Sequence, residues 1–234
     1  MVIPAKKEKA EKVYLMVHKN ITEENYSKHR KYYTEIQKKL NAAKIETELV
    51  YCDWQNIEEI TRVARDLILK EADSEIAINL ASGSKNHAIG LDRACMTVRK
   101  RENIHPFYPE AKKWNAGKYP HQQSEGVKQI KQVPIHRIIV PEPELIEALR
   151  IIKRDAVPIP RHKGMYGVKK KVLTKVLYGD DSKVSMTKLQ RNITGTLKKT
   201  WRAIDWVPVG QSDWIYLTDE GKYLRYVLKN EETY

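Results

Sequence analysis

The chain has 234 residues, of which 41% are hydrophobic, and its formal net charge is +13 with a sequence pI near 9.5. This composition predicts a folded protein with a packed core, and no apolar run reaches the roughly 18 residues of a membrane span. The lysine-rich start is not a secretory signal pattern, and the two cysteines form no disulfide framework or metal motif. We therefore expect a cytoplasmic protein with no membrane partner and no metal. The positive charge favours polyanionic partners, and solubility or thermal adaptation is the alternative explanation for it.

The first part of the chain alternates strand-like and helix-like patterns. Apolar, β-prone runs predict strands over 12–18, 45–53 and 74–82, and amphipathic spacing predicts helices over 22–43, 56–72 and 86–101. Such alternation is typical of an α/β fold whose parallel strands are joined by right-handed crossovers.

Ligands of such folds bind beyond the carboxyl ends of the strands. Three predicted loops lie there, at 18–20, 52–54 and 81–86. The first two offer Asn20 and Asp53 as polar candidates for ligand binding.

Two more strands are predicted over 103–110 and 125–140, followed by a helix over 141–155. The segment 156–164 contains two prolines and basic residues, and we interpret it as a linker. We therefore expect two domains, 1–155 and 156–234. Residues 151–234 hold 17 Lys and Arg against 9 Asp and Glu, so the smaller C-terminal part has the higher charge density.

The C-terminal part has a different order of elements. We predict an amphipathic helix over 166–179 with Val168, Val172, Leu173, Val176 and Leu177 facing inward. One or two helices follow over 185–204, and then a strand, a glycine-containing hairpin, a second strand and a closing helix over 205–228. This order is typical of a winged helix.

The most informative loop joins the third predicted strand to its helix. It reads Ser82-Gly83-Ser84-Lys85-Asn86. Backbone amides at a helix start attract anions, glycine permits close approach, and lysine supplies a movable charge. The loop therefore predicts a phosphate site, although a tight turn with an N-cap serine explains the same residues equally well. The dinucleotide fingerprint G-x-G-x-x-G and the phosphate-binding element G-K-[ST] are both absent.

The stretch INLASGSKNHAIGLDRACM, with AEKVYLMVH before it and EGVKQIKQVPIHRIIVPEPE after it, resembles the CARF domain (CRISPR-associated Rossmann fold). Nearly the whole chain resembles the archaeal CARF proteins that end in a winged helix and are described as transcriptional regulators. The resemblance implies a Rossmann-like three-layer parallel-sheet domain followed by a winged helix-turn-helix domain.

The resemblance also implies a ligand and a partner. CARF domains pair as homodimers that hold a cyclic oligoadenylate, a messenger of CRISPR antiviral defence, and we expect the cyclic tetra-adenylate ring and no cofactor. Ser82, Gly83, Ser84, Lys85 and Asn86 match the ligand loop of the family. The family usually begins with one more strand than this chain shows, which leaves the completeness of the ligand site open.

Double-stranded DNA is the expected partner of the C-terminal domain. The candidate contacts lie on the polar face of its second helical region and at the hairpin tip: Arg191, Asn192, Thr194, Thr196, Lys198, Lys199, Arg202, Gln211 and Ser212. A merely solvated helix face is the alternative for these charges. The tryptophans of this domain, Trp201, Trp206 and Trp214, are better explained by core packing.

Two other functions remain open. Some CARF domains cleave the cyclic ring, and Lys85 is the one weak catalytic candidate for that reaction. Arg99 and His105 have the spacing of a ribonuclease motif, and Glu110 to Lys112 resemble half of a metal-nuclease motif, although we interpret both as chance. The second alternative is a dimerisation protein with a vestigial ligand site.

Overall fold

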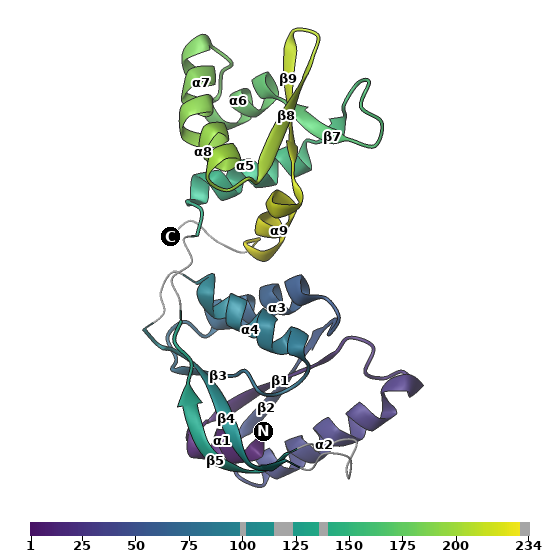
Figure 1. Ribbon diagram of the computed structural model, residues 1–234, viewed down its shortest axis with the longest axis vertical. Helices are drawn as coiled ribbons and strands as arrows, with labels where there is room; N and C mark the ends of the chain where they lie inside the picture. The colour runs from purple at the N-terminus through teal and green to yellow at the C-terminus, as the bar shows by residue number, and fades with distance from the viewer. Residues whose placement is uncertain (99–101, 115–123, 136–139, 230–234) are drawn as a thin grey trace. The chain divides into compact units, whose positions relative to one another are not determined.

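The computed structural model describes residues 1–98, 102–114, 124–135 and 140–229 (Figure 1). The chain divides into two compact units, Met1–Ile138 and Ile139–Tyr234, called unit 1 and unit 2 below. This division precedes the boundary that we expected at residue 155. The helix α5, Pro143–Arg154, belongs to unit 2, because its buried residues Leu145, Leu149 and Ile152 join the core of that unit.

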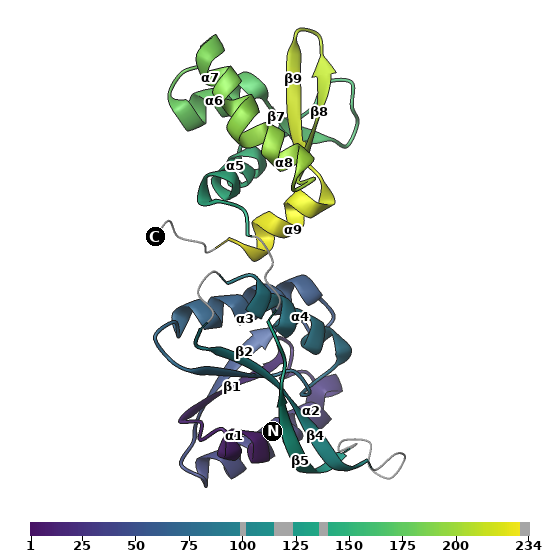
Figure 2. The ribbon, with the colours of Figure 1, turned by 60° about the vertical axis from the view of Figure 1, so that its left-hand side comes forward.

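Unit 1 is a mixed α/β structure that contains parallel strands. Its elements are α1 (Val2–Lys7), β1 (Lys12–His18), η1 (Glu24–Tyr26), α2 (Ser27–Asn41), β2 (Glu46–Cys52), α3 (Ile57–Lys70), β3 (Ile76–Asn79), α4 (Lys85–Met96), β4 (Ile104–Trp114) and β5 (Ser124–Gln132). Figures 1 and 2 show α3 and α4 on one side of the strands and α1 and α2 on the other.

The strands of unit 1 form two hydrogen-bonded sheets within the described residues. β1 pairs in parallel with β2, from Lys12 opposite Glu46 to His18 opposite Cys52. β3 pairs in parallel with β4, and β4 pairs antiparallel with β5. The sequence predicted one parallel arrangement of the first three strands, but the short β3 forms its ladder with β4. The last residues of the strand expected over 125–140 lie largely outside the described residues.

Apolar faces of the helices explain why these elements pack. α3 and α4 enclose a core with Ala64, Ile68, Ala94 and Ile104. α2 places Ile36 and Leu40 against Leu15 of β1 in a second cluster. Gly90 of α4 permits the close contact with α3, because a Cβ at this position would lie 2.6 Å from Cγ2 of Ile60.

Unit 2 combines helices with an antiparallel sheet. After α5 its elements are β6 (Val157–Pro158), β7 (Tyr166–Lys169), α6 (Lys170–Tyr178), α7 (Lys183–Lys188), η2 (Leu189–Thr194), α8 (Gly195–Lys199), β8 (Ile204–Val209), β9 (Ser212–Leu217) and α9 (Asp219–Val227). The strand order is β6-β7-β9-β8, and β8 and β9 form a hairpin (Figure 2).

The first part of unit 2 differs from the prediction. Residues 166–169 form strand β7 rather than the first turn of a helix, because Gly167 lets the backbone approach Ile215 of β9, where a Cβ would lie 2.5 Å from the carbonyl oxygen. The helix therefore starts at Lys170, and Val172 and Val176, predicted to face inward, are exposed. The predicted linker 156–164 contains β6 and the buried Ile159.

The segments α7, η2 and α8 follow one another without an intervening turn. η2 is a π-helical turn in which the amide of Gly195 donates to the carbonyl oxygen of Gln190, five residues earlier. Glycine is required there, because a Cβ would lie 2.6 Å from that oxygen. One helical run therefore extends over 183–199, and its buried residues Leu189, Ile193 and Leu197 anchor it in the core of unit 2.

Candidate functional site

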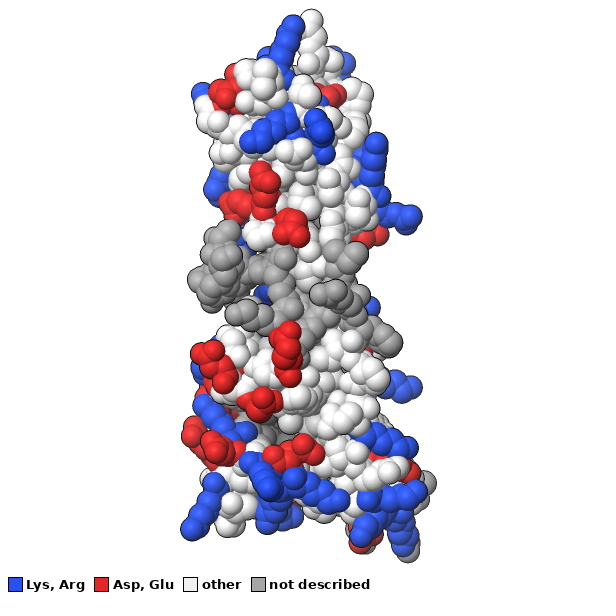
Figure 3. Space-filling view, turned by 90° about the vertical axis from the view of Figure 1, so that its left-hand side faces the viewer, with Lys and Arg blue, Asp and Glu red and all other residues white. Residues whose placement is uncertain are grey.

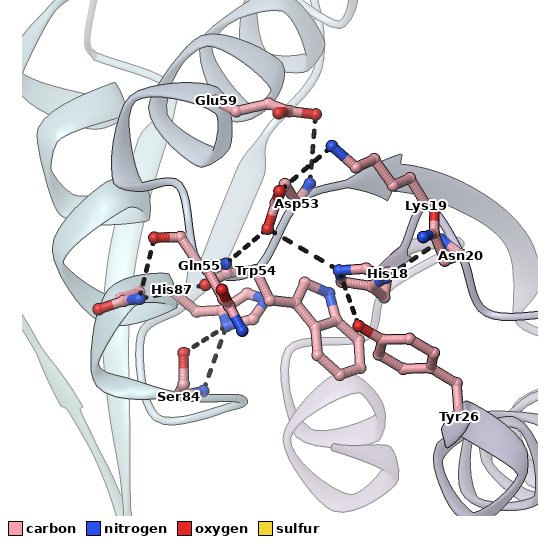
Figure 4. A network of polar contacts seen from close by, with 11 residues as sticks. His18, Lys19, Asn20, Tyr26, Asp53, Trp54, Gln55, Glu59, Ser84 and His87 are labelled. Carbon is pink, nitrogen blue, oxygen red and sulfur yellow. Dashed lines mark hydrogen bonds and ion pairs between the residues drawn. The ribbon is translucent and has the colours of Figure 1, made fainter. Parts of the chain in front are cut away.

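Three loops of unit 1 meet beyond the carboxyl ends of its parallel strands. Lys19, after β1, places Nζ 3.2 Å from Oδ2 of Asp53, after β2. Asn86, in the first turn of α4, donates from Nδ2 to the carbonyl oxygen of Trp54 at 3.2 Å. The sequence grouped these loops from strand topology alone, and the structure brings them together (Figure 4).

The loop between β3 and α4 is shaped by one glycine and one histidine. Gly83 has φ +99°, and a Cβ there would lie 2.8 Å from Cγ of His87. Ser84 is the N-cap of α4 and exchanges two hydrogen bonds with His87, whose Nδ1 accepts from the Ser84 amide at 3.2 Å. Since Nδ1 is an acceptor, the proton of the neutral ring is on Nε2. Burial lowers the pKa of His87, which favours this neutral form.

This geometry divides the five predicted loop residues by role. Gly83 and Ser84 build the turn and the cap, as the tight-turn alternative required. Lys85 is exposed, Ser82 is half-buried, and Asn86 ties the loop to the segment after β2. The first amides of a helix have no acceptor within the helix. The Ser84 side chain satisfies the amide of His87, so the amides of Lys85 and Asn86 are the donors that the cap leaves for an anion.

Asn20 and Asp53 organise the neighbouring loops. The amide of Asn20 donates to Nδ1 of His18 at 3.1 Å. Asp53 accepts from the amide of Gln55 at 2.9 Å, and this hydrogen bond together with Lys19 holds the pKa of Asp53 below its usual range. An ionised carboxylate repels phosphate, so Asp53 is suited to positioning Lys19 rather than to direct contact with an anion.

An aromatic cluster lies beside these loops and was missed in the sequence. The His18 ring stacks on Tyr26 with centroids 4.2 Å apart, and Nε2 of His18 lies 3.2 Å from the Tyr26 hydroxyl. Trp54 contacts the rings of His18, Tyr26 and His87 at centroid distances of 5.5 to 6.3 Å (Figure 4). It also contacts His29, at a centroid distance of 5.1 Å. Its indole Nε1 is enclosed and has no hydrogen-bond partner among the described residues. The sequence offered one signal for this cluster: Trp54 directly follows Asp53, in the loop after β2.

Cys52 ends β2, beside the three loops. Burial raises the pKa of the Cys52 thiol to about 12, with the carboxylates of Glu59 and Asp53 contributing in the same direction, so Cys52 is no thiolate nucleophile near neutral pH. Within the described ranges, no three His, Cys, Asp or Glu residues gather as a metal site. Of the ribonuclease-like pair, Arg99 lies outside the described residues and His105 is an exposed residue of β4 that contacts Glu75.

Basic side chains are spread over both units. Figure 3 shows lysine and arginine in blue among acidic residues in red on one face of each unit. In unit 1, Lys6, Lys9 and Lys44 line a shallow hollow at the amino ends of β1 and β2, away from the loops described above. This accounts for part of the positive charge of unit 1 without involving its candidate ligand site.

The predicted DNA contacts of unit 2 differ in their exposure. Arg191, Asn192, Lys199, Arg202 and Gln211 are exposed, and Thr196, Lys198 and Ser212 are half-buried. Thr194 is only 1% exposed, and its hydroxyl lies 3.3 Å from Oε1 of Gln190, so its prediction as a DNA contact was wrong: it stabilises the π-helical turn.

Lys198 is less available than the sequence implied. Its Nζ lies 2.5 Å from Oδ1 of Asp205 and 3.8 Å from the centre of the Trp206 ring. The core role expected for the tryptophans is confirmed, since Trp214 is buried and Trp201 and Trp206 pack against the main core of unit 2.

The helical run over 183–199 has an outer face that the predicted contacts did not include. Lys183, Val184, Thr187 and Lys188 are exposed and precede Arg191 at helical spacing. The predicted helix covered two of these residues, but the predicted contacts began only at Arg191. An amphipathic projection that started at the Ser182 cap would have found them.

Comparison with known proteins adds one similarity. Residues 1–114, just under half of the chain, match the family model described as "HFX_2341_N:-like, N-terminal". The match extends from the start of unit 1 to the end of β4. No curated protein matches the chain. In the parts of the chain that the structure describes, no helix has both the length and the apolar character needed to cross a membrane.

Proposed function

We propose that this protein is a ligand-responsive DNA-binding regulator in which unit 1 binds a phosphate-containing messenger and unit 2 binds double-stranded DNA. The observation that carries the proposal is the convergence of three loops at the carboxyl ends of β1, β2 and β3. There Asn86 joins two loops and α4 presents its first amides. Anions are favoured at such a helix start.

The ligand proposed for unit 1 is a cyclic oligoadenylate, with the tetra-adenylate ring as the first choice. This choice rests on the resemblance of the 78–96 stretch to CARF domains. Lys85 is exposed beside the loop amides and supplies a positive charge for phosphate. The proposal includes a Rossmann-like character for unit 1 and a homodimer in which two such loops share one ring.

The arrangement of unit 2 supports a winged helix. The helix α5 is followed in order by the strands β6 and β7, the helix α6, the helical run over 183–199 and the β8–β9 hairpin, and β7 pairs with β9. In this proposal the 183–199 run enters the major groove and the hairpin tip, with Gln211, contacts the phosphate backbone. The net positive charge of the chain would supply the salt-dependent part of the affinity for DNA.

The ligand part is tested by calorimetric titration of the full chain with cyclic tetra-adenylate and with cyclic hexa-adenylate. We expect one ring per two chains, with heat lost in Lys85→Ala. Lys7→Ala is the matched control, because Lys7 is an exposed lysine of α1 outside the three loops, and it should bind as the wild type does. Absence of binding to both rings would refute the ligand assignment.

A further inference from the structure

Val184 is an apolar residue in an unusual position. Its exposed fraction is 79%, the highest among the large hydrophobic residues that the structure describes as exposed. It lies in the first turn of α7, on the side of the helical run opposite Leu189 and Ile193, which are fully buried. The fold of unit 2 therefore gains no core packing from this side chain.

The surroundings of Val184 are polar and carry more positive than negative charge. Lys183 is adjacent, and Thr187, Lys188 and Arg191 follow at three, four and seven residues, all exposed, while Asp180 and Asp181 precede the helix. Residues at these spacings lie on one face of a helix. The Lys188 ammonium lies 4.6 Å from the centre of the Tyr178 ring. A protein partner would favour a larger apolar patch. A single apolar side chain in polar surroundings of net positive charge is instead complementary to a base edge within a phosphate-lined groove.

The start of α7 is held firmly. Ser182 is its N-cap and its side chain accepts from the amide of Ser185. Asp180 accepts from the Ser182 amide at 2.8 Å and from the Ser185 hydroxyl at 3.0 Å. Val184 therefore projects from a backbone fixed on both sides, which is the condition for a contact that discriminates between bases.

We propose that Val184 is a specificity-determining residue that contacts the 5-methyl group of a thymine in the major groove. Thymine is the base that presents a methyl group there, and apolar side chains contact it. Thr187 and Arg191, on the same face, contact neighbouring base edges or phosphates. This inference rests on the proposed DNA binding by unit 2 and adds to it the base that one residue reads.

The experiment begins with selection of bound duplexes from a randomised DNA pool by the full chain, with and without cyclic tetra-adenylate. Each enriched thymine is then replaced by deoxyuridine, which removes only the methyl group. Affinities are measured for the wild type, for Val184→Ala and for the control Val176→Ala. Val176 is an exposed valine of α6, with an exposed fraction of 45%, outside the helical run.

We expect one thymine per half-site at which deoxyuridine weakens wild-type binding about fourfold, the factor that corresponds to burial of one methyl-sized group at ~0.8 kcal/mol. The same replacement should leave the affinity of Val184→Ala unchanged, and Val176→Ala should respond as the wild type does. DNA binding with no such thymine, or an equal loss in Val184→Ala, would overturn this inference alone. Failure to bind any duplex, with or without the ring, would overturn the proposed DNA binding as well.

Discussion

Gly83 combines two constraints in the loop between β3 and α4, and its replacement by alanine should be strongly destabilising. Its φ of +99° is a region that alanine disfavours by ~1–2 kcal/mol. The added Cβ would also lie 2.8 Å from Cγ of His87, so the ring must move and the hydrogen bonds that cap α4 weaken by about 1 kcal/mol. We therefore expect Gly83→Ala to lower the free energy of opening of this region by about 2–3 kcal/mol.

The assay is hydrogen exchange followed by mass spectrometry on peptides from α4, because it reports on unit 1 separately from unit 2. Gly179→Ala is the control for backbone strain: its φ is +82°, and a Cβ added there would have no other atom within 4 Å. It should cost only the ~1–2 kcal/mol of the backbone in peptides of unit 2. In a His87→Ala background, the free-energy cost of Gly83→Ala should likewise fall to the ~1–2 kcal/mol of the backbone alone.

Equal costs of Gly83→Ala in the presence and absence of the His87 ring would refute this reasoning, because the clash would then contribute nothing. A cost below that of Gly179→Ala would refute it too.

Three further predictions concern stability and binding. Burial lowers the pKa of His87, so the unfolded chain binds a proton more readily than the folded chain does. The stability of unit 1 should therefore fall as the pH drops below ~6.5. Denaturation at about pH 7.5 and pH 5.5 measures this dependence, which His87→Gln should remove. Gly90→Ala should destabilise unit 1 by about 1–3 kcal/mol through overpacking against Ile60, measured by the same exchange assay, and a neutral result would contradict the observed helix contact. Thr194 is buried and Arg191 is exposed, so the two should differ in their effect on DNA affinity measured by fluorescence anisotropy. Thr194→Val should leave the affinity within about twofold of the wild type, whereas Arg191→Ala should weaken it about fivefold or more. The reverse order would contradict their assigned positions.

The sequence predicted the elements that depend on local pattern. The strand at 12–18 has the expected bounds, and the helix predicted over 56–72 is α3 with Asn56 as its N-cap. The start of α2 was placed five residues too early, because a 3₁₀ turn over Glu24–Tyr26 precedes it. Apolar spacing alone does not distinguish these two kinds of turn.

Tertiary contacts account for the larger differences. β7 has helix-forming lysines after it, and only the approach of Gly167 to β9 makes its first residues a strand. The boundary of the units was misplaced because the prolines at 156–164 suggested a linker, whereas α5 packs into the core of unit 2.

The residues of the candidate site could be predicted only in part, because some of their contacts are tertiary. Strand topology is sufficient to bring together the loops at Lys19, Asp53 and Asn86. It does not indicate that Ser84 is occupied by the His87 cap or that Trp54 lies among four rings, since both depend on side chains that meet only in the folded unit.

We propose that a ligand in unit 1 changes DNA binding by unit 2. It is tested most directly by measuring the affinity of the full chain for its selected duplex with and without saturating cyclic tetra-adenylate, in the wild type and in Lys85→Ala. Because allosteric coupling is commonly about 5- to 150-fold, we expect a change of at least about fivefold in the wild type and none in Lys85→Ala. An affinity that is the same with and without the ring, in a protein that calorimetry shows to bind it, would contradict the account.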